Sequence, residues 1–188
     1  MKTCAGCSAC CETIPVMEIG LAPFTPCTYQ ATVLDVSGPG CKIYATRPGS
    51  CRSWSCLWLK SNLPDELKPS RSGLVINPTP DLIRVNDKRV PAREVWVMAG
   101  HENDWETNDQ VWHLIVSLLH YDECAVLWRM RDGTAIGFWR DPKTGEIGRS
   151  QPTQAVPDDE HDLGSNQERV FEAELMLRHR SQHRGGRR

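Results

Sequence analysis

Residues 4–11 read CAGCSACC, a stretch in which three cysteines are separated by two residues each and a fourth follows directly. Two intervening residues allow a tight turn to bring both sulfurs within about 2.3 Å of one metal ion. The same spacing, completed by a remote cysteine, also holds iron–sulfur clusters. The stretch therefore predicts that metal–thiolate bonds organise this part of the chain, and its spacing does not distinguish zinc from iron.

The chain has 188 residues and nine cysteines, eight of which lie within the first 56 residues. Residues 1–4 lead into this cluster without the apolar segment of a secretory signal, so we expect a cytoplasmic protein. Because reducing cytosol disfavours structural disulfides, clustered cysteines there indicate metal ligands or redox centres. The candidate metal ligands are Cys4, Cys7, Cys10, Cys11, Cys27, Cys41, Cys51 and Cys56.

Cys10 and Cys11 restrict how these ligands can share metal ions. Adjacent side chains diverge, so we expect the two thiols to serve different metal ions rather than one tetrahedral ion. Eight thiolates divide naturally into two sets of four. The sequence leaves open which cysteine joins which set, and it also allows a polynuclear site or one site with spare thiols. The expected cofactor is zinc or iron, including an iron–sulfur cluster, at two metal positions.

Basic residues near the later cysteines are candidates for hydrogen bonding to the thiolates. The first 62 residues hold five basic and three acidic residues, and ionised thiols would reverse that balance. Sites with four thiolates carry excess negative charge, which nearby donors reduce. The candidate donors are Lys42, Arg47 and Arg52.

The cysteine pattern also resembles a known family. Residues 40–59 read GCKIYATRPGSCRSWSCLWL, and together with residues 4–11 they resemble the CxxCxxCC cysteine-cluster family, also called the YkgJ-like family. The LPDELKP run at residues 63–69 is similar to some bacterial members, so the resemblance covers about the first third of the chain. It implies zinc or iron chelation by these cysteines and no assigned reaction.

From about residue 70 the sequence changes to short β-rich runs separated by turn residues. Strands are expected at residues 74–76, 82–85, 94–98, 125–131 and 135–140. A buried helix is expected at residues 109–121, with Thr107, Asn108 and Asp109 as possible N-caps. Asp132-Gly133 suits a tight hairpin turn, and alternation of apolar residues predicts that residues 125–131 bury one face. We therefore expect an α+β fold with a small antiparallel sheet and a loop-rich, metal-organised N-terminal region.

Three regions are expected along the chain. Residues 1–62 form the cysteine-cluster region, and residues 63–150 form a small α+β body that makes one domain with it. Residues 151–188 form a polar, partly disordered tail with a short helix near residues 170–177. Residues 178–188 contain five arginines and no acidic residue. No apolar run approaches the length of about 18 residues needed to cross a bilayer.

Three functions are compatible with these features. The first is a protein that chelates zinc or iron through its clustered cysteines, as a binding or delivery module. The second is an iron–sulfur electron-transfer or oxidoreductase component. The third is a zinc module that binds nucleic acid through the arginine-rich tail, although the net charge of -2 provides no general attraction for nucleic acid. No catalytic constellation identifies an enzyme, and the sequence names no partner.

Overall fold

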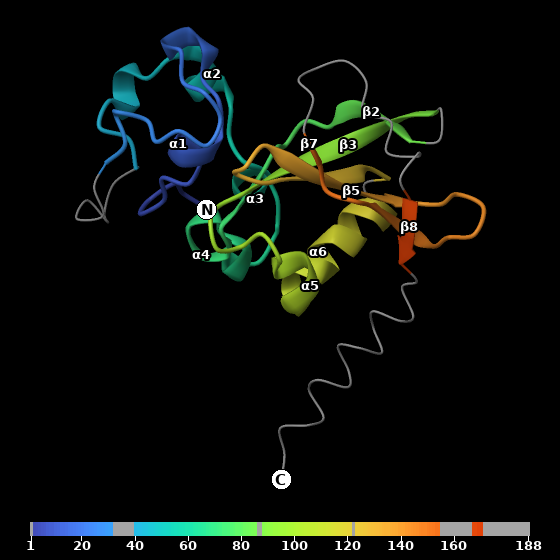
Figure 1. Cartoon of the computed structure of the whole chain (residues 1–188). Coiled ribbons are helices and arrows are strands. Elements are labelled where there is room, and N and C mark those ends of the chain that lie inside the picture. Colours follow the sequence, from blue (N-terminus) through green and yellow to red (C-terminus); the bar gives the residue numbers. More distant parts are fainter. Residues whose placement is uncertain (1, 32–39, 86–87, 122, 155–166, 171–188) are drawn as a thin grey trace. The chain divides into compact units, whose positions relative to one another are not determined.

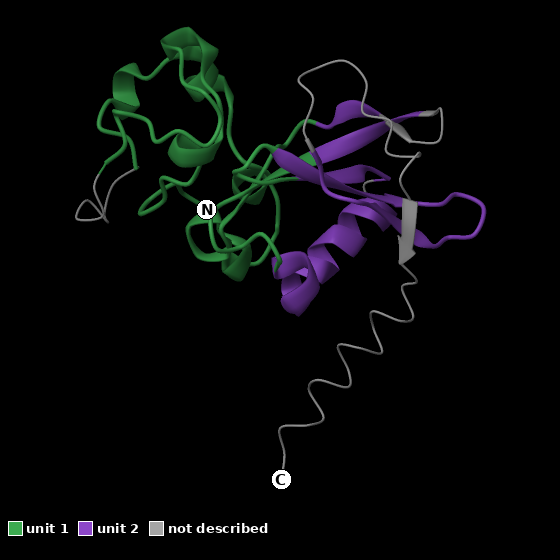
Figure 2. Cartoon of the chain, viewed as in Figure 1, with its two compact units in different colours: residues 1–79, 94–103, 129–133 green, residues 80–93, 104–128, 134–188 purple. Residues whose placement is uncertain are grey.

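The computed structural model describes residues 2–31, 40–85, 88–121, 123–154 and 167–170, and its fold is α+β (Figure 1). The chain divides into two compact units (Figure 2). Unit 1 comprises residues 1–79, 94–103 and 129–133, and unit 2 comprises residues 80–93, 104–128 and 134–188. Unit 1 therefore joins the cysteine-rich segment to stretches that come much later in the sequence.

Short helices and turns make up the cysteine-rich part of unit 1, as its weak apolar periodicity suggests. The helices in this part are α1 (Cys10–Thr13), η1 (Met17–Ile19), η2 (Tyr44–Thr46), α2 (Gly49–Ser53) and α3 (Leu57–Lys60). They are followed by η3 (Asp65–Leu67) and α4 (Pro69–Ser72). Gly73 ends α4 with a φ of 68°, and a Cβ there would lie 2.2 Å from the His101 ring. Both the backbone conformation and the close contact therefore require glycine.

Two strand segments form the sheet of unit 1. Strand β1 (Leu74–Ile76) pairs antiparallel with the second half of β3 (Lys88–Val97), so that Val75 lies opposite Trp96. All three residues of β1 are buried. The strand is therefore a core element, as expected for residues 74–76.

The other strands are β2 (Asp81–Val85), β4 (Ala125–Arg129), β5 (Thr134–Arg140), β6 (Ile147–Ser150), β7 (Thr153–Gln154) and β8 (Gln167–Val170). The strand order is β1-β3-β4-β5-β6-β8, while β2 also pairs with β3 and β7 with β5. The pairings of β1 and β2 with β3, of β6 and β7 with β5, and of β8 with β6 are antiparallel. These strands include all five that the sequence predicts.

Helix α6 (Asp109–His120) in unit 2 is the expected buried helix, and it follows the short helix α5 (Asp104–Thr107). The Asn108 side chain caps α6 by accepting a hydrogen bond of 3.0 Å from the backbone N–H of Gln110. The helix packs on β5, where the Trp112 and Phe138 rings meet edge to face with centroids 6.4 Å apart. Most apolar residues of α6 are buried, which explains why they occupy most faces of this helix.

Strand β4 differs from the expectation of one buried face. Residues 125–128 are all buried, and Trp128 and Val126 have 0% exposure. A strand between two neighbours with both faces covered favours a continuous apolar run over alternation. The turn that follows lies where it was expected, but of the pair Asp132-Gly133 only Gly133 has a positive φ, of 85°. The Gly133 amide donates to the Met130 carbonyl oxygen at 3.1 Å, so the turn is centred on residues 131 and 132.

The end of the chain is described only in part. Of the helix expected near residues 170–177, Val170 belongs instead to β8, where it pairs with Ile147, and residues 171–177 lie outside the described residues. The arginine-rich residues 178–188 also lie outside them. Among the described residues, no helix has the length and apolar character needed to cross a bilayer.

Candidate metal centre

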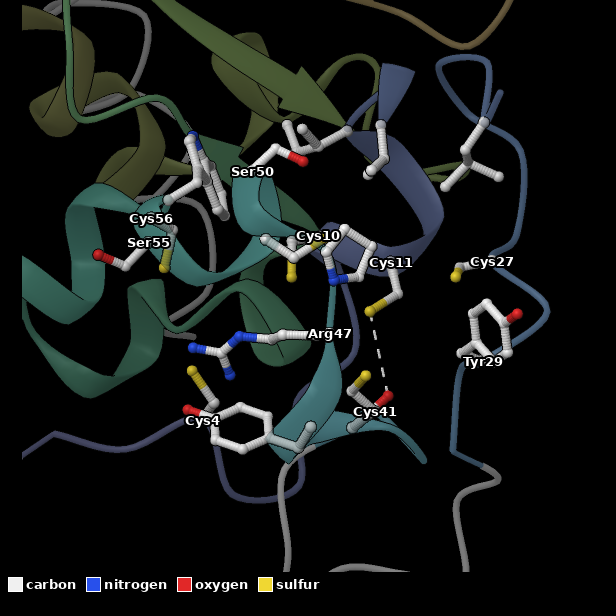
Figure 3. Close-up of a pocket in the computed structure, with 18 of the residues that line it drawn as sticks. Cys4, Cys10, Cys11, Cys27, Tyr29, Cys41, Arg47, Ser50, Ser55 and Cys56 are labelled. Carbon is white, nitrogen blue, oxygen red and sulfur yellow. Dashed lines mark hydrogen bonds between the residues drawn. The ribbon is translucent and has the colours of Figure 1, made fainter. Parts of the chain in front are cut away.

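Unit 1 contains a cavity of about 220 Å³ that is lined by all eight candidate ligands (Figure 3). These are Cys4, Cys7, Cys10, Cys11, Cys27, Cys41, Cys51 and Cys56. These eight are free thiols, and the ninth cysteine of the chain, Cys124, is buried in unit 2. The fold thus brings together cysteines from segments that lie far apart in the sequence.

The first block of cysteines is shaped by a turn and a helix. The Cys7 amide donates to the Cys4 carbonyl oxygen at 3.0 Å, and Gly6 between them adopts a φ of 63°. Helix α1 then begins at Cys10, so Cys10 and Cys11 lie in its first turn. The two-residue spacing therefore forms the tight turn that metal ligation requires.

Cys27 and Cys41 are held near the first block by backbone hydrogen bonds. The Cys27 amide donates to the Cys11 carbonyl oxygen at 2.8 Å, and Gln30 forms an isolated β-bridge with Cys41. Gly40 makes the approach possible, because a Cβ there would lie 2.4 Å from the Cys7 carbonyl oxygen. Glycine directly before a cysteine was the sequence signal for this close approach.

The last two cysteines lie on neighbouring short helices. Cys51 is in α2, and Cys56 precedes the first residue of α3. Glu18 holds the start of α2, because its Oε2 accepts hydrogen bonds from the Ser50 amide at 3.0 Å and the Ser50 hydroxyl at 2.8 Å. A contact between distant segments therefore fixes the position of Cys51.

Part of the cavity rests on an apolar core cluster formed by Ala9, Val75 and Trp96. Three of the thiol residues, namely Cys7, Cys10 and Cys56, pack against this core cluster. The Trp54 ring also packs there and lines the cavity. Such a surrounding lowers the local dielectric constant and limits the access of water to bound metal.

Burial changes the protonation of the thiols. It raises the pKa values of Cys4, Cys51 and Cys56, because the charged thiolate is disfavoured away from water. A hydrogen bond between the neighbouring thiols raises the pKa of Cys10 well above its ordinary value and lowers that of Cys11. A metal ion that binds here must therefore displace protons.

Arg47 supplies the single fixed positive charge among the described residues that line the cavity, and no carboxylate lines it there. A hydrogen bond with Tyr44 raises the pKa of the Arg47 guanidinium, and the thiols of Cys4 and Cys41 add to that effect. Its Nε atom is buried and has no hydrogen-bond partner in the described chain. The other two candidate donors, Lys42 and Arg52, are exposed and do not line the cavity.

Sequence reasoning missed a second basic residue near the thiols. The Lys68 Nζ donates to the Ala5 carbonyl oxygen at 2.7 Å, and its charge acts to lower the pKa of Cys4. The two residues are far apart in the sequence, so no local pattern indicates the contact. Tyr44 was also missed, although its position three residues before Arg47 was a usable signal.

The donor set suits a soft metal ion, because thiols predominate among the possible ligands and the remaining walls are largely apolar. In the described part of the chain, no three His, Cys, Asp or Glu side chains already stand close enough to hold an ion. A bound metal would therefore have to draw the thiols together. When bound, zinc would supply a structural or exchangeable centre, and iron would supply redox chemistry.

Comparison of the chain with protein-family models, with curated proteins and with solved structures gives no match. The resemblance of residues 4–11 and 40–59 to the CxxCxxCC family therefore stays a prediction. The arrangement of the thiols around one cavity does not depend on that resemblance.

Proposed function

We propose that the chain is a metal-binding protein whose unit 1 chelates zinc or iron through its eight clustered cysteines. One observation carries this proposal: cysteines from residue 4 to residue 56 all line the same cavity. Eight free thiols around one cavity have a direct use as ligands, because thiolates bind zinc and iron strongly. Binding or delivery of the metal requires no further chemistry from the chain.

An iron–sulfur protein is the second candidate, and the arrangement of four cysteines favours it. Cys4, Cys7 and Cys10 have the spacing used for such clusters, and Cys56 is a remote cysteine that packs with Cys7 and Cys10 against the same core cluster. This candidate assigns the protein to electron transfer or to an oxidoreductase.

The proposal includes membership of the CxxCxxCC cysteine-cluster family and a cytoplasmic location. A reducing compartment keeps thiols available for metal, and the eight free thiols around the cavity support such a location. The family assignment is supported by the sequence of residues 4–11 and 40–59.

Metal analysis of the full chain, purified without oxygen, tests the function when it is combined with an absorption spectrum. We expect a colourless protein that contains about two zinc ions per chain. A brown protein with iron, sulfide and broad visible absorption would establish the iron–sulfur candidate instead. A chain that retains neither metal after loading with zinc or iron would contradict the proposed function. Cys124→Ser is the control, because Cys124 does not line the cavity.

A further inference from the structure

The eight thiols differ in what surrounds them. Cys7, Cys10 and Cys56 pack against the core cluster. The Cys7 amide donates to the Cys4 carbonyl oxygen at 3.0 Å, so Cys4 belongs to the same turn as Cys7. These four residues, Cys4, Cys7, Cys10 and Cys56, are called the inner set.

The other four cysteines are connected to one another. The Cys27 amide bonds to the Cys11 carbonyl oxygen, and the Cys27 carbonyl oxygen accepts from Gln30, the bridge partner of Cys41. Cys51, from α2, is the remaining thiol that lines the cavity. These four residues, Cys11, Cys27, Cys41 and Cys51, are called the outer set.

The boundary between the two sets falls between Cys10 and Cys11 in α1. The Cys11 thiol points toward the Gly40 carbonyl oxygen, 4.0 Å away and next to Cys41, whereas Cys10 packs on the core cluster. Figure 3 shows Cys10 on the side of Cys56, and Cys11 on the side of Cys41. The Cys10 and Cys11 thiols are hydrogen-bonded to each other in the metal-free chain, so the boundary runs between two thiols that touch.

We propose that the inner set and the outer set each bind one metal ion, in two adjacent four-thiolate sites within the cavity that Arg47 also lines. This inference rests on the proposed function of metal chelation. When the ion is Zn²⁺, four thiols of one set lose their protons to solvent and the product is a zinc tetrathiolate with two net negative charges. No electron is transferred in this step.

Arg47 lines the same cavity as both sets, and Figure 3 shows its side chain beside Cys4. The guanidinium has donors for more than one acceptor, and its buried Nε has no partner within the described chain. As both sites become negatively charged, one cation in the same cavity lowers the repulsion.

Two separate sites fit the donors better than one polynuclear site. Each set has four thiols, which is the number that closes a tetrahedral zinc site. The inner set has the two-residue spacing plus a remote cysteine, whereas the outer set is assembled by backbone contacts between distant segments. The sets meet where α1 places two neighbouring cysteines.

Pairs of Cys→Ser substitutions in the full chain test this division, with Zn²⁺ as the probe and a chelator of known affinity as competitor. A within-set pair, Cys10→Ser with Cys56→Ser, should retain about one zinc ion at wild-type affinity, because one four-thiol site is intact. A cross-set pair, Cys10→Ser with Cys51→Ser, should retain none at that affinity. Both variants lack the same number of thiols, so each is the matched control of the other.

The opposite results have distinct meanings. Loss of both tight ions in the within-set pair, or retention of one in the cross-set pair, would overturn the division while leaving chelation intact. A wild-type chain that binds no Zn²⁺ would overturn the proposed function, and this inference with it.

A second measurement uses the wild-type chain and does not depend on the folding of variants. The zinc-loaded protein is exposed to increasing chelator together with a thiol-alkylating reagent, and the modified cysteines are mapped by mass spectrometry. We expect the four thiols of one set to become reactive together as one ion leaves. Molecules that are modified at a mixture of both sets after losing one ion would contradict the proposal.

Discussion

Arg47 and Tyr44 are stacked, with the guanidinium carbon of Arg47 3.8 Å from the centre of the Tyr44 ring. Tyr44 begins η2 and Arg47 directly follows this short helix, so the chain itself sets the pair in register. The stack holds a planar cation at the wall of the cavity, with its Nε buried. Positive charge is thereby fixed where binding of metal by thiolates would create negative charge.

Replacing Arg47 should weaken metal binding without abolishing it. We expect Arg47→Gln to lower the affinity for Zn²⁺ by about 10- to 100-fold, the usual effect of losing a group that supports metal ligands. Chelator competition measures this change. Arg52→Gln is the control, because Arg52 is exposed and does not line the cavity. Equal losses of Zn²⁺ affinity in Arg47→Gln and Arg52→Gln would show that positive charge acts from a distance rather than at the cavity.

Lys2 should contribute to the stability of unit 1. Its Nζ donates to the carbonyl oxygens of Trp58, Ser61 and Leu63, and it lies 4.6 Å from the centre of the Trp58 ring. We expect Lys2→Met to lower the free energy of unfolding by about 1–3 kcal/mol, because charged hydrogen bonds to a partly buried group are lost.

Denaturant unfolding of the full chain measures the effect of Lys2→Met. Lys60→Met is the matched control, since Lys60 is exposed on α3 in the same unit. A Lys2→Met variant as stable as this control would show that the interaction with the Trp58 segment contributes little.

The contact between Glu18 and Ser50 should depend on pH. Hydrogen bonds from Ser50 lower the pKa of Glu18 in the folded chain. A lowered folded pKa means that the stabilisation is complete above the ordinary carboxyl pKa and is lost as the pH falls through the folded value. Glu18→Gln should therefore be less stable than wild type at neutral pH, and the difference should shrink in acid.

Unfolding of wild type and Glu18→Gln at a series of pH values checks this dependence. Glu66→Gln in the same unit serves as the control, because Glu66 is an exposed carboxylate. A difference between wild type and Glu18→Gln that stays constant down to the acid limit of folding would rule out this role of the carboxylate.

Gly148 in β6 should tolerate no side chain. It lies opposite Trp139 of β5, and a Cβ at this position would lie 2.5 Å from the Trp139 ring. We expect Gly148→Ala to destabilise the chain by about 1–3 kcal/mol through overpacking. Combining it with Trp139→Leu should give a loss smaller than the sum of the two single losses, because the clash is removed. Strict additivity in thermal or denaturant unfolding would contradict this explanation.

The regular elements of the chain were predictable because local signals agreed with the final packing. The apolar residues of α6 and the cap at Asn108 marked a buried helix, and Asp132-Gly133 marked the turn after β4. The burial of both faces of β4 was not predictable, because it depends on the neighbours of that strand in the sheet. The periodicity of apolar residues describes one segment at a time and does not show which strands lie beside it.

The clustering of the eight cysteines was predictable from the sequence, and their geometry was not. Cysteine spacing identified the eight thiols, and the structure places them all around one cavity. Their arrangement follows from contacts between distant segments, such as Cys27 with Cys11 and Glu18 with Ser50. Arg47 was one of three candidate donors, and only the fold separates it from Lys42 and Arg52.

Counting the reactive thiols of the full native chain before and after loading with Zn²⁺ tests the central claim most directly. We predict that about two zinc ions bind and that the eight thiols lining the cavity lose their reactivity together, at about four thiols per ion. Thiols that stay fully reactive while zinc binds elsewhere, or a chain that binds no zinc or iron, would contradict the claim that these cysteines chelate metal.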